Sequence, residues 1–224
     1  IKVYKNVIKR INPGNQQAIT RLIQLLIRTR SLDEALNLLD RLSAENPGNL
    51  DIALQKAHVL VQKKSFGEAI AVLLPVVKAR PQNLRLQIYL ATLYEENSEV
   101  NEAVAAYQSV LAQNPDAYDV RIRLGYLYFY RLKNISDALV QGEFAKEIDP
   151  KRAESYLFTG LVLHDAKRYE DAVNTFLDGI EVKPSLPNLH FHLGAALDKL
   201  NQFDEMVQAM KKTIELDGKH ANAL

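Results

Sequence analysis

The chain has 224 residues, of which 47% are hydrophobic and 25% are charged, so it can bury a core and is not an intrinsically disordered segment. Its 28 Lys and Arg residues against 27 Asp and Glu residues leave a net charge of +1, which favours neither nucleic acid nor an anionic membrane as a partner. The chain has no cysteine, which excludes disulfides, thiolate metal ligands and cysteine nucleophiles, and no apolar run approaches the ~18 residues of a membrane span.

The stretch from Ile1 to Leu32 has the strongest local charge, because it holds basic residues and no acidic one. Three of the lysines recur at a helical spacing, so this end fits docking to an acidic partner or to another domain. The plainer interpretation is a solvated helix face. Interleaved aromatics for base stacking are missing, which does not favour nucleic-acid binding. The basic residues are Lys2, Lys5, Lys9, Arg10, Arg21, Arg28 and Arg30.

A repeat runs through the whole chain. Six prolines follow one another at intervals of 34, 34, 34, 35 and 34 residues, and an alanine lies twelve residues before each of the last five. A fixed period of this length indicates a stacked repeat architecture. The prolines are Pro13, Pro47, Pro81, Pro115, Pro150 and Pro184, and the alanines are Ala35, Ala69, Ala103, Ala138 and Ala172.

Each repeat is predicted to be a helix hairpin, because two stretches of helical apolar period lie between successive prolines. The turns carry capping patterns: Ser31 with Glu34, and Ser65 with Glu68, form S-x-x-E boxes, and Asn134 with Asp137 and Gln202 with Glu205 form weaker versions. Proline then ends the second helix. The stripes of the first hairpin are Leu22, Leu25 and Leu26, then Ala35, Leu38, Leu39 and Leu42.

Three departures from the period call for local adjustments. Pro75 lies within a second helix, which we expect it to kink or shorten. The fourth repeat has one extra residue, predicted in the inter-helix turn near Lys133. Gly142 takes a position that usually holds an aromatic residue or leucine, so either Phe144 refills the gap, or the gap is a pocket, or the core is repacked locally.

The residues that recur at equivalent positions of these repeats resemble the tetratricopeptide repeat, which has a small residue at its eighth position and a large one at its eleventh. The small residues are Ala57, Ala91, Gly125, Gly160 and Gly194, whereas Ile23 replaces the small residue in the first repeat. The large residues are Leu26, Leu60, Tyr94, Tyr128, Leu163 and Leu197. The resemblance implies an all-α, right-handed superhelical α-solenoid of about six helix-turn-helix repeats. Their predicted ranges are 16–49, 50–83, 84–117, 118–152, 153–186 and 187–220.

Residues 1–15 resemble the second helix of a preceding repeat, and residues 221–224 the start of a further one, so the sequence is interpreted as an excerpt of a longer array. The N-P-G-N and N-P-D joints resemble those of bacterial arrays, including envelope-assembly proteins. A location in the bacterial cytoplasm and one in the periplasm both agree with the sequence.

No converging set of catalytic or ligand residues is found. Phosphate-binding glycine loops, nucleophile elbows and H-E-x-x-H are missing. His58 and His164 lie three repeats apart, and His190 and His192 point to opposite sides of one helix. The sequence therefore predicts no enzyme, no cofactor and no metal site.

In the resembling family, the second, fifth, ninth, twelfth and thirteenth positions of each first helix line a concave groove. Apolar side chains gather there in the fourth and fifth repeats, which predicts a partner-binding surface with an acidic rim. The alternative is that the rings pack against the neighbouring repeat. The predicted groove residues are Ile88, Thr92, Glu95, Ile122, Tyr126, Phe129, Tyr130, Leu157, Leu161 and His164, and the rim is Glu95, Asp119, Glu154, Asp165 and Arg123.

The family's carboxylate clamp for peptide C-termini is not supplied by any three consecutive repeats. The predicted function is therefore a non-catalytic scaffold whose groove binds a peptide or helix segment of a protein partner. One alternative is a self-associating structural array. The other is a regulatory or targeting module of a larger enzyme or envelope-assembly protein.

Overall fold

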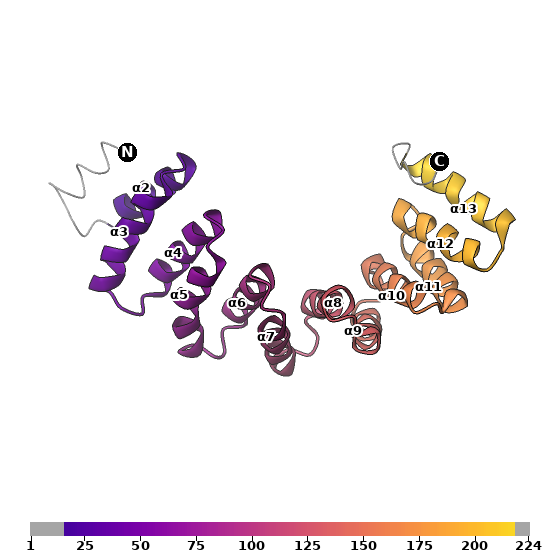
Figure 1. Cartoon of the computed structure of the whole chain (residues 1–224), viewed down its shortest axis with the longest axis horizontal. Coiled ribbons are helices and arrows are strands. Elements are labelled where there is room, and N and C mark those ends of the chain that lie inside the picture. The colour runs from indigo at the N-terminus through magenta and orange to yellow at the C-terminus, as the bar shows by residue number, and fades with distance from the viewer. Residues whose placement is uncertain (1–15, 218–224) are drawn as a thin grey trace. The chain divides into compact units, whose positions relative to one another are not determined.

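A computed structural model describes residues 16–217 (Figure 1). They form twelve α-helices and one π-helical turn, and none of these residues is in a β-strand. The predicted all-α solenoid is thereby confirmed. The α-helices are α2 (Gln16–Arg28), α3 (Leu32–Glu45), α4 (Leu50–Gln62), α5 (Phe66–Lys78), α6 (Leu84–Glu96), α7 (Val100–Gln113), α8 (Tyr118–Tyr126), α9 (Ile135–Ile148), α10 (Ala153–Asp165), α11 (Tyr169–Val182), α12 (Pro187–Lys199) and α13 (Phe203–Leu216), and the π-helical turn is η2 (Leu127–Arg131).

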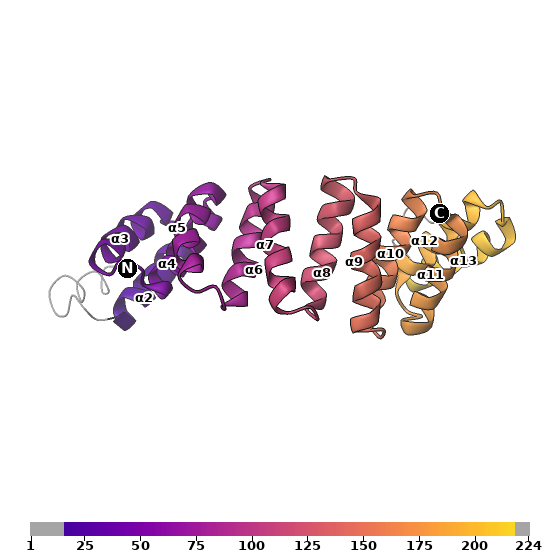
Figure 2. The ribbon, with the colours of Figure 1, turned by 90° about the horizontal axis from the view of Figure 1, so that it is seen from below.

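The chain divides into two compact parts, residues 1–106 and residues 107–224, with the division inside α7. We call them the N-terminal part and the C-terminal part. Within each part a helix packs mainly against its neighbours in sequence, and α10 also contacts α12 (Figure 2). Contacts limited to near neighbours are typical of a solenoid. The predicted second helix in residues 1–15 and the predicted repeat start at 221–224 lie outside the described residues.

The alanines that define the repeat lie in the interior. All five are fully buried: Ala35, Ala69, Ala103, Ala138 and Ala172. Around them, large side chains of successive helices fill the interior. In the N-terminal part, for example, Leu60, Leu73 and Leu90 belong to one buried cluster. A side chain longer than alanine would separate the paired helices, which explains why this column is small.

Every hairpin turn of the described chain has one residue in the left-handed backbone region. The turn after α2 is a Schellman motif: Arg30 has a φ of 56°, and the Ser31 N–H donates to the Leu26 carbonyl at 2.8 Å. The turn after α4 repeats it with Lys64, whose φ is 60°. The left-handed residues of the other four turns are Ser98, Lys133, Lys167 and Asn201.

The capping boxes differ from the prediction. The hydroxyls of Ser31 and Ser65 make no capping hydrogen bond, whereas the Asn134 side chain accepts from the Asp137 N–H at 3.1 Å. The Gln202 side chain does not cap either. The serine hydroxyls are therefore not the groups that satisfy the first amides of α3 and α5.

Pro75 is accommodated within a continuous helix. It lies on the exposed side of α5, which has 13 residues, one fewer than α3 and α7. The helix continues for three residues beyond Pro75, which leaves one backbone carbonyl without its helical N–H donor.

A set of polar side chains near the start of the first helices fixes the joints between repeats. In four repeats the fourth residue donates to the carbonyl of the proline six residues earlier. The bonds run from Gln87 to Pro81, from Arg121 to Pro115, from Tyr156 to Pro150 and from His190 to Pro184. His190 therefore has a structural partner. Sequence reasoning missed this column because four different residue types share one role.

Candidate protein-binding site

The predicted groove residues lie on three first helices. Ile88, Thr92 and Glu95 are on α6, in the N-terminal part. The other seven are in the C-terminal part: Ile122 and Tyr126 on α8, Phe129 and Tyr130 on η2, and Leu157, Leu161 and His164 on α10.

Two residues expected to face solvent are buried. Ile122 is 3% exposed and Phe129 is 8% exposed, so the prediction of open side chains at these positions is wrong. At the fifth position, where Ile122 stands, the equivalent Leu54 and Leu157 also pack against buried clusters, so this position contributes to the core. Phe129 lies in the π-helical turn with its ring 4.6 Å from that of Tyr130.

Tyr130 is an exposed aromatic residue, and the neighbouring Tyr126 is half-buried. The Tyr130 side chain is 51% exposed, and its ring stacks on that of Tyr126 at 5.8 Å between centroids and an interplanar angle of 14°. Tyr126 in turn meets the buried Phe158 ring edge-on at 4.7 Å. Burial, together with the nearby Glu154 carboxylate, raises the pKa of Tyr126 to about 12, so its phenol is neutral at physiological pH. The Tyr130 ring is thus held in place by the Tyr126 ring, which itself packs against Phe158.

The extra residue of the fourth repeat lies in the helix and not in the turn. In the other hairpins the N–H before the second helix donates to a carbonyl five residues back, as from Ser31 to Leu26. Here Asn134 donates to Tyr128, six residues back, and Leu132 donates to Leu127 with the five-residue spacing of a π-turn. The expected insertion near Lys133 is therefore absorbed by η2, which is the segment that carries Tyr130.

The gap at Gly142 is filled by the next helix. A Cβ atom at Gly142 would lie 2.3 Å from the Thr159 Oγ1 and 3.2 Å from the Phe158 ring, both on α10. A Cβ atom at Gly125 would lie 2.7 Å from the same ring. Phe144, in contrast, is 44% exposed and lies under the Arg121 guanidinium. Of the three expectations for Gly142, local repacking is the one observed.

The predicted acidic rim is partly neutralised. Arg152 forms ion pairs with both Asp119 and Glu154, each at 2.9 Å, and its guanidinium lies 3.7 Å above the Tyr118 ring. This bridge could not be foreseen from the sequence, because Arg152 precedes α10 in a joint between repeats. Asp165 is exposed at the end of α10. The rim therefore holds less free negative charge than its composition suggests.

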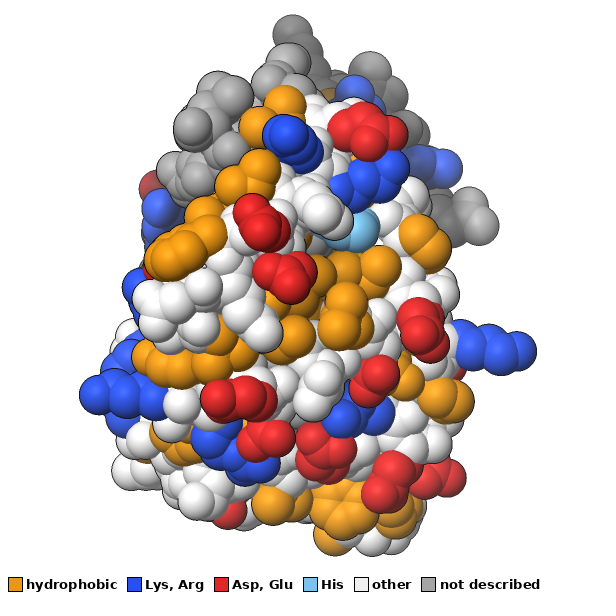
Figure 3. Space-filling view, turned by 90° about the vertical axis from the view of Figure 1, so that its right-hand side faces the viewer, with side chains coloured by type: hydrophobic (Ala, Val, Ile, Leu, Met, Phe, Trp, Pro, Cys, Tyr) orange, Lys and Arg blue, Asp and Glu red, His pale blue; other side chains and the backbone are white. Residues whose placement is uncertain are grey.

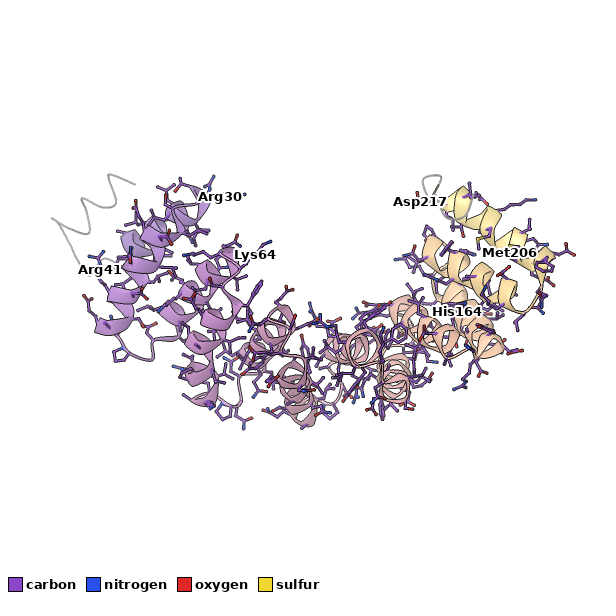
Figure 4. All side chains as sticks on the ribbon, viewed as in Figure 1. Arg30, Arg41, Lys64, His164, Met206 and Asp217 are labelled. Atoms are coloured by element: carbon purple, nitrogen blue, oxygen red, sulfur yellow. The ribbon has the colours of Figure 1, made fainter. Side chains whose placement is uncertain are left out.

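On α10, Leu157, Leu161 and His164 are all half-buried. His164 lies near the end of α10 (Figure 4). Its ring meets the Tyr169 ring edge-on at 5.3 Å, and its Nε2 is buried without a hydrogen-bond partner among the described residues. On α6, Ile88 and Glu95 are half-buried, and the Thr92 hydroxyl donates to the Ile88 carbonyl at 2.9 Å. Thr92 is thus engaged with its own helix.

A separate cavity of about 510 Å³ lies between α2 and α4 in the N-terminal part. Its apolar side is formed by Ile23, Ile27 and Leu54. Its polar lining is Thr20, Gln24, Arg28, Gln55 and His58, with no acidic residue. Arg30 and Lys64 stand at the turns that follow the two helices (Figure 4). Of the predicted basic end, residues 1–15 lie outside the described structure.

Among residues 16–217, no group of three or more histidine, aspartate or glutamate side chains gathers as a metal ion requires. No helix in this range is long and apolar enough to cross a membrane.

Family profiles agree with the helix hairpins. One profile described as tetratricopeptide repeat matches residues 1–57, 30–93 and 60–116, a second matches residues 90–143 and a third matches residues 187–220. The chain belongs to the tetratricopeptide-repeat family. No curated protein sequence matches it.

Solved structures of tetratricopeptide-repeat proteins share the fold. A repeat protein from Parabacteroides merdae has 16% identity and a TM-score of 0.70 over all of this chain and 83% of its own. MamA has 22% identity and a TM-score of 0.67 over 74% of this chain and 96% of its own. YrrB, described as a repeat protein with an unusual peptide-binding site, has 16% identity and a TM-score of 0.64 over 83% and 95%. At these identities the likeness shows the fold alone.

Tetratricopeptide-repeat proteins are generally non-catalytic scaffolds for protein interactions, and this chain has the fold of such a scaffold. The fourth repeat differs from the others of the described chain in three features that occur together. It has a π-helical turn, an exposed tyrosine, and the buried Phe158 ring beneath its aromatic residues.

Proposed function

We propose that the chain is a non-catalytic scaffold that binds an extended or helical segment of a partner protein on the faces of its first helices. The main anchors are Tyr126 and Tyr130, and Leu157, Leu161 and His164 on α10 extend the surface. The residues of α6, Ile88, Thr92 and Glu95, form a second contact region. The buried Phe129 ring lies against the Tyr130 ring, and Ile122 is part of the core.

The observation that carries this proposal is the exposure of Tyr130. Its ring is half open to solvent and is stacked on Tyr126, which itself rests on Phe158. A tyrosine held in this way offers a large contact area at a low cost in side-chain entropy. The π-helical turn supports the same conclusion, because π-turns in helices are frequent at functional sites.

The charge around the anchors favours a largely apolar segment. Arg152 compensates Asp119 and Glu154, so a strongly cationic ligand gains little there. We therefore expect the bound segment to insert aromatic or aliphatic side chains beside Tyr130 and to make few ion pairs.

The test starts with a photo-crosslinking amino acid at position 130 in the source organism's lysate, followed by mass spectrometry of the crosslinked segment. A synthetic peptide of that segment is then titrated against the wild type and Tyr130→Ala. We expect the variant to bind at least tenfold more weakly, as for a hot-spot residue.

Phe144→Ala is the matched control, because Phe144 is a similarly exposed aromatic on a second helix. Equal losses from both variants, or no loss from Tyr130→Ala in a folded protein, would show that the face of α8 and η2 is not the binding surface. Turnover of any substrate by this chain would contradict the scaffold.

A further inference from the structure

The cavity of about 510 Å³ between α2 and α4 has an apolar floor and a polar rim. Ile23 is 2% exposed, and Ile27 and Leu54 are half-buried, so aliphatic side chains form the floor. Gln24 and Arg28 are exposed at the rim. Pockets that bind ligands commonly have about 300–1,000 Å³ and a similar mixture of apolar and polar surface.

A short side chain at the sixth position of the second repeat leaves this cavity open. In the third repeat this position holds Tyr89, which packs against a buried cluster, and in the fifth it holds Phe158, which is fully buried. The second repeat has Gln55 there, half-buried in the cavity wall. Both helices of the cavity are described, and α3 contacts each of them, so the cavity lies between two repeats and not at an end of the described chain.

The polar groups of the cavity have few partners of their own. Among the described residues, the side chains of Thr20, Gln55 and Arg28 form no hydrogen bond or ion pair, and Gln24 accepts only a long bond of 3.5 Å from Arg21. No acidic side chain lines the cavity. By contrast, the C-terminal end of the molecule, which Figure 3 views, displays both acidic and basic side chains.

These groups fit an acidic and partly aliphatic peptide segment. A guanidinium such as that of Arg28 binds a carboxylate through paired N–H donors. The amides of Gln24 and Gln55 can each donate to and accept from a peptide backbone. A cationic segment would find no acidic partner here. Residues 1–15 contain no Asp or Glu, so the chain's own N-terminal segment does not supply the carboxylate.

We propose that this cavity binds a segment of a partner protein in which an aliphatic side chain stands next to an Asp or Glu. The aliphatic side chain lies on Ile27 and Leu54, and the carboxylate pairs with Arg28. Gln24 and Gln55 bind the backbone of the segment. The site lies in the N-terminal part and is independent of partner binding at Tyr130.

The first test selects ligands from random peptides displayed on phage between fixed flanks, so that side chains are the only carboxylates of the displayed segment. The bait is the wild type, and peptides that also bind Gln55→Tyr are removed. This variant places in the cavity wall the residue type that Tyr89 has in the third repeat, so it should block the cavity without adding charge. We expect the remaining peptides to be enriched in Asp or Glu beside Leu, Ile or Val.

The second test titrates a selected peptide, made with a C-terminal amide, and a form in which its acidic residue is replaced by the corresponding amide. Arg28→Gln should weaken binding of the acidic form by about fivefold or more and leave binding of the neutral form within about twofold. The change copies Gln62, the equivalent residue of the second repeat. Arg41→Gln on α3 is the matched control, because Arg41 is also exposed but does not line the cavity (Figure 4), and it should change neither affinity by more than about twofold. Circular dichroism checks that each variant is folded.

A selection that yields no peptide able to distinguish the wild type from Gln55→Tyr overturns the proposal, because the cavity then binds no peptide. Selected peptides that are neutral or rich in Lys and Arg overturn it as well, since the ligand is then of another class. Equal losses of both peptide forms on Arg28→Gln contradict the pairing of Arg28 with a carboxylate. The same peptide should bind Tyr130→Ala as tightly as the wild type, so failure of either proposal is seen separately.

Discussion

Two hairpins built on the same repeat fill their interiors in different ways. In the hairpin of α4 and α5, Ala57 and Leu73 occupy the eighth and twenty-fourth positions, and Leu73 is fully buried beside Leu60. In the hairpin of α8, η2 and α9, glycines occupy the corresponding positions, Gly125 and Gly142. The volume that a leucine fills in the first hairpin is filled in the second by Phe158, which comes from the next repeat.

The difference affects what is left on the surface. Because Phe158 supplies the interior of the fourth repeat, the aromatics of that repeat's own first helix are not all needed in the core. Tyr126 rests on Phe158, and Tyr130 stays half open. The regular hairpin of α4 and α5 has no exposed aromatic among its described residues. An unusual core and an open binding surface thus occur together in one repeat.

The largest expected effect comes from removing the shared ring. Phe158→Ala leaves a cavity between two glycines, neither of which has a side chain to fill it, so we expect a loss of about 3–5 kcal/mol in the free energy of unfolding. Urea unfolding followed by circular dichroism measures it. Because Tyr126 loses its support, peptide binding at Tyr130 should weaken as well.

Leu73→Ala is the comparison in the regular hairpin. It should cost about 2–5 kcal/mol and leave peptide binding at Tyr130 unchanged wherever the protein remains folded. If Phe158→Ala costs less than about 1 kcal/mol, Phe158 does not hold the fourth repeat together and the contrast between the hairpins fails.

Replacing a glycine by alanine should change the free energy of unfolding in opposite directions in the two hairpins. Gly142→Ala adds a Cβ atom 2.3 Å from the buried Thr159 Oγ1, so overpacking should outweigh the gain in helix propensity and destabilise the protein by about 1–2 kcal/mol. Gly67→Ala on α5 meets Asn97 at an ordinary 3.7 Å, so propensity should dominate and stabilise it by about 0.5 kcal/mol. Unfolding midpoints of the two variants shifted in the same direction would contradict this.

The repeat frame could be predicted from sequence because a few columns carry most of the constraint. Alanine at a close helix contact and proline at a helix end each have one physical role, so their spacing determines the order of the helices. Gly142 could not be interpreted in the same way. Sequence shows that a side chain is missing, but which neighbour enters the space depends on packing between repeats.

Only part of the candidate site could be predicted from the sequence, and the reason is related. An extra residue can lengthen a turn or widen a helix without any change in composition, so the π-helical turn at η2 was not foreseen. Groove positions taken from the family assume regular helices with a fixed face, and this assumption placed Phe129 and Ile122 in solvent. Of the residues that the same rule selected in the fourth repeat, Tyr130 is exposed and Tyr126 is half-buried beneath it.

The smallest expected effect tests the caps of the same two hairpins. Asn134→Ala removes the acceptor of the Asp137 N–H and the donor to its carboxylate at 2.7 Å, so it should cost about 1 kcal/mol. Ser65→Ala removes a hydroxyl that makes no capping bond and should change stability by less than about 0.3 kcal/mol. Both are measured by urea unfolding. A Ser65→Ala cost equal to that of Asn134→Ala would mean that the S-x-x-E pattern caps α5 in solution, since only a side chain that accepts a backbone N–H can produce that loss.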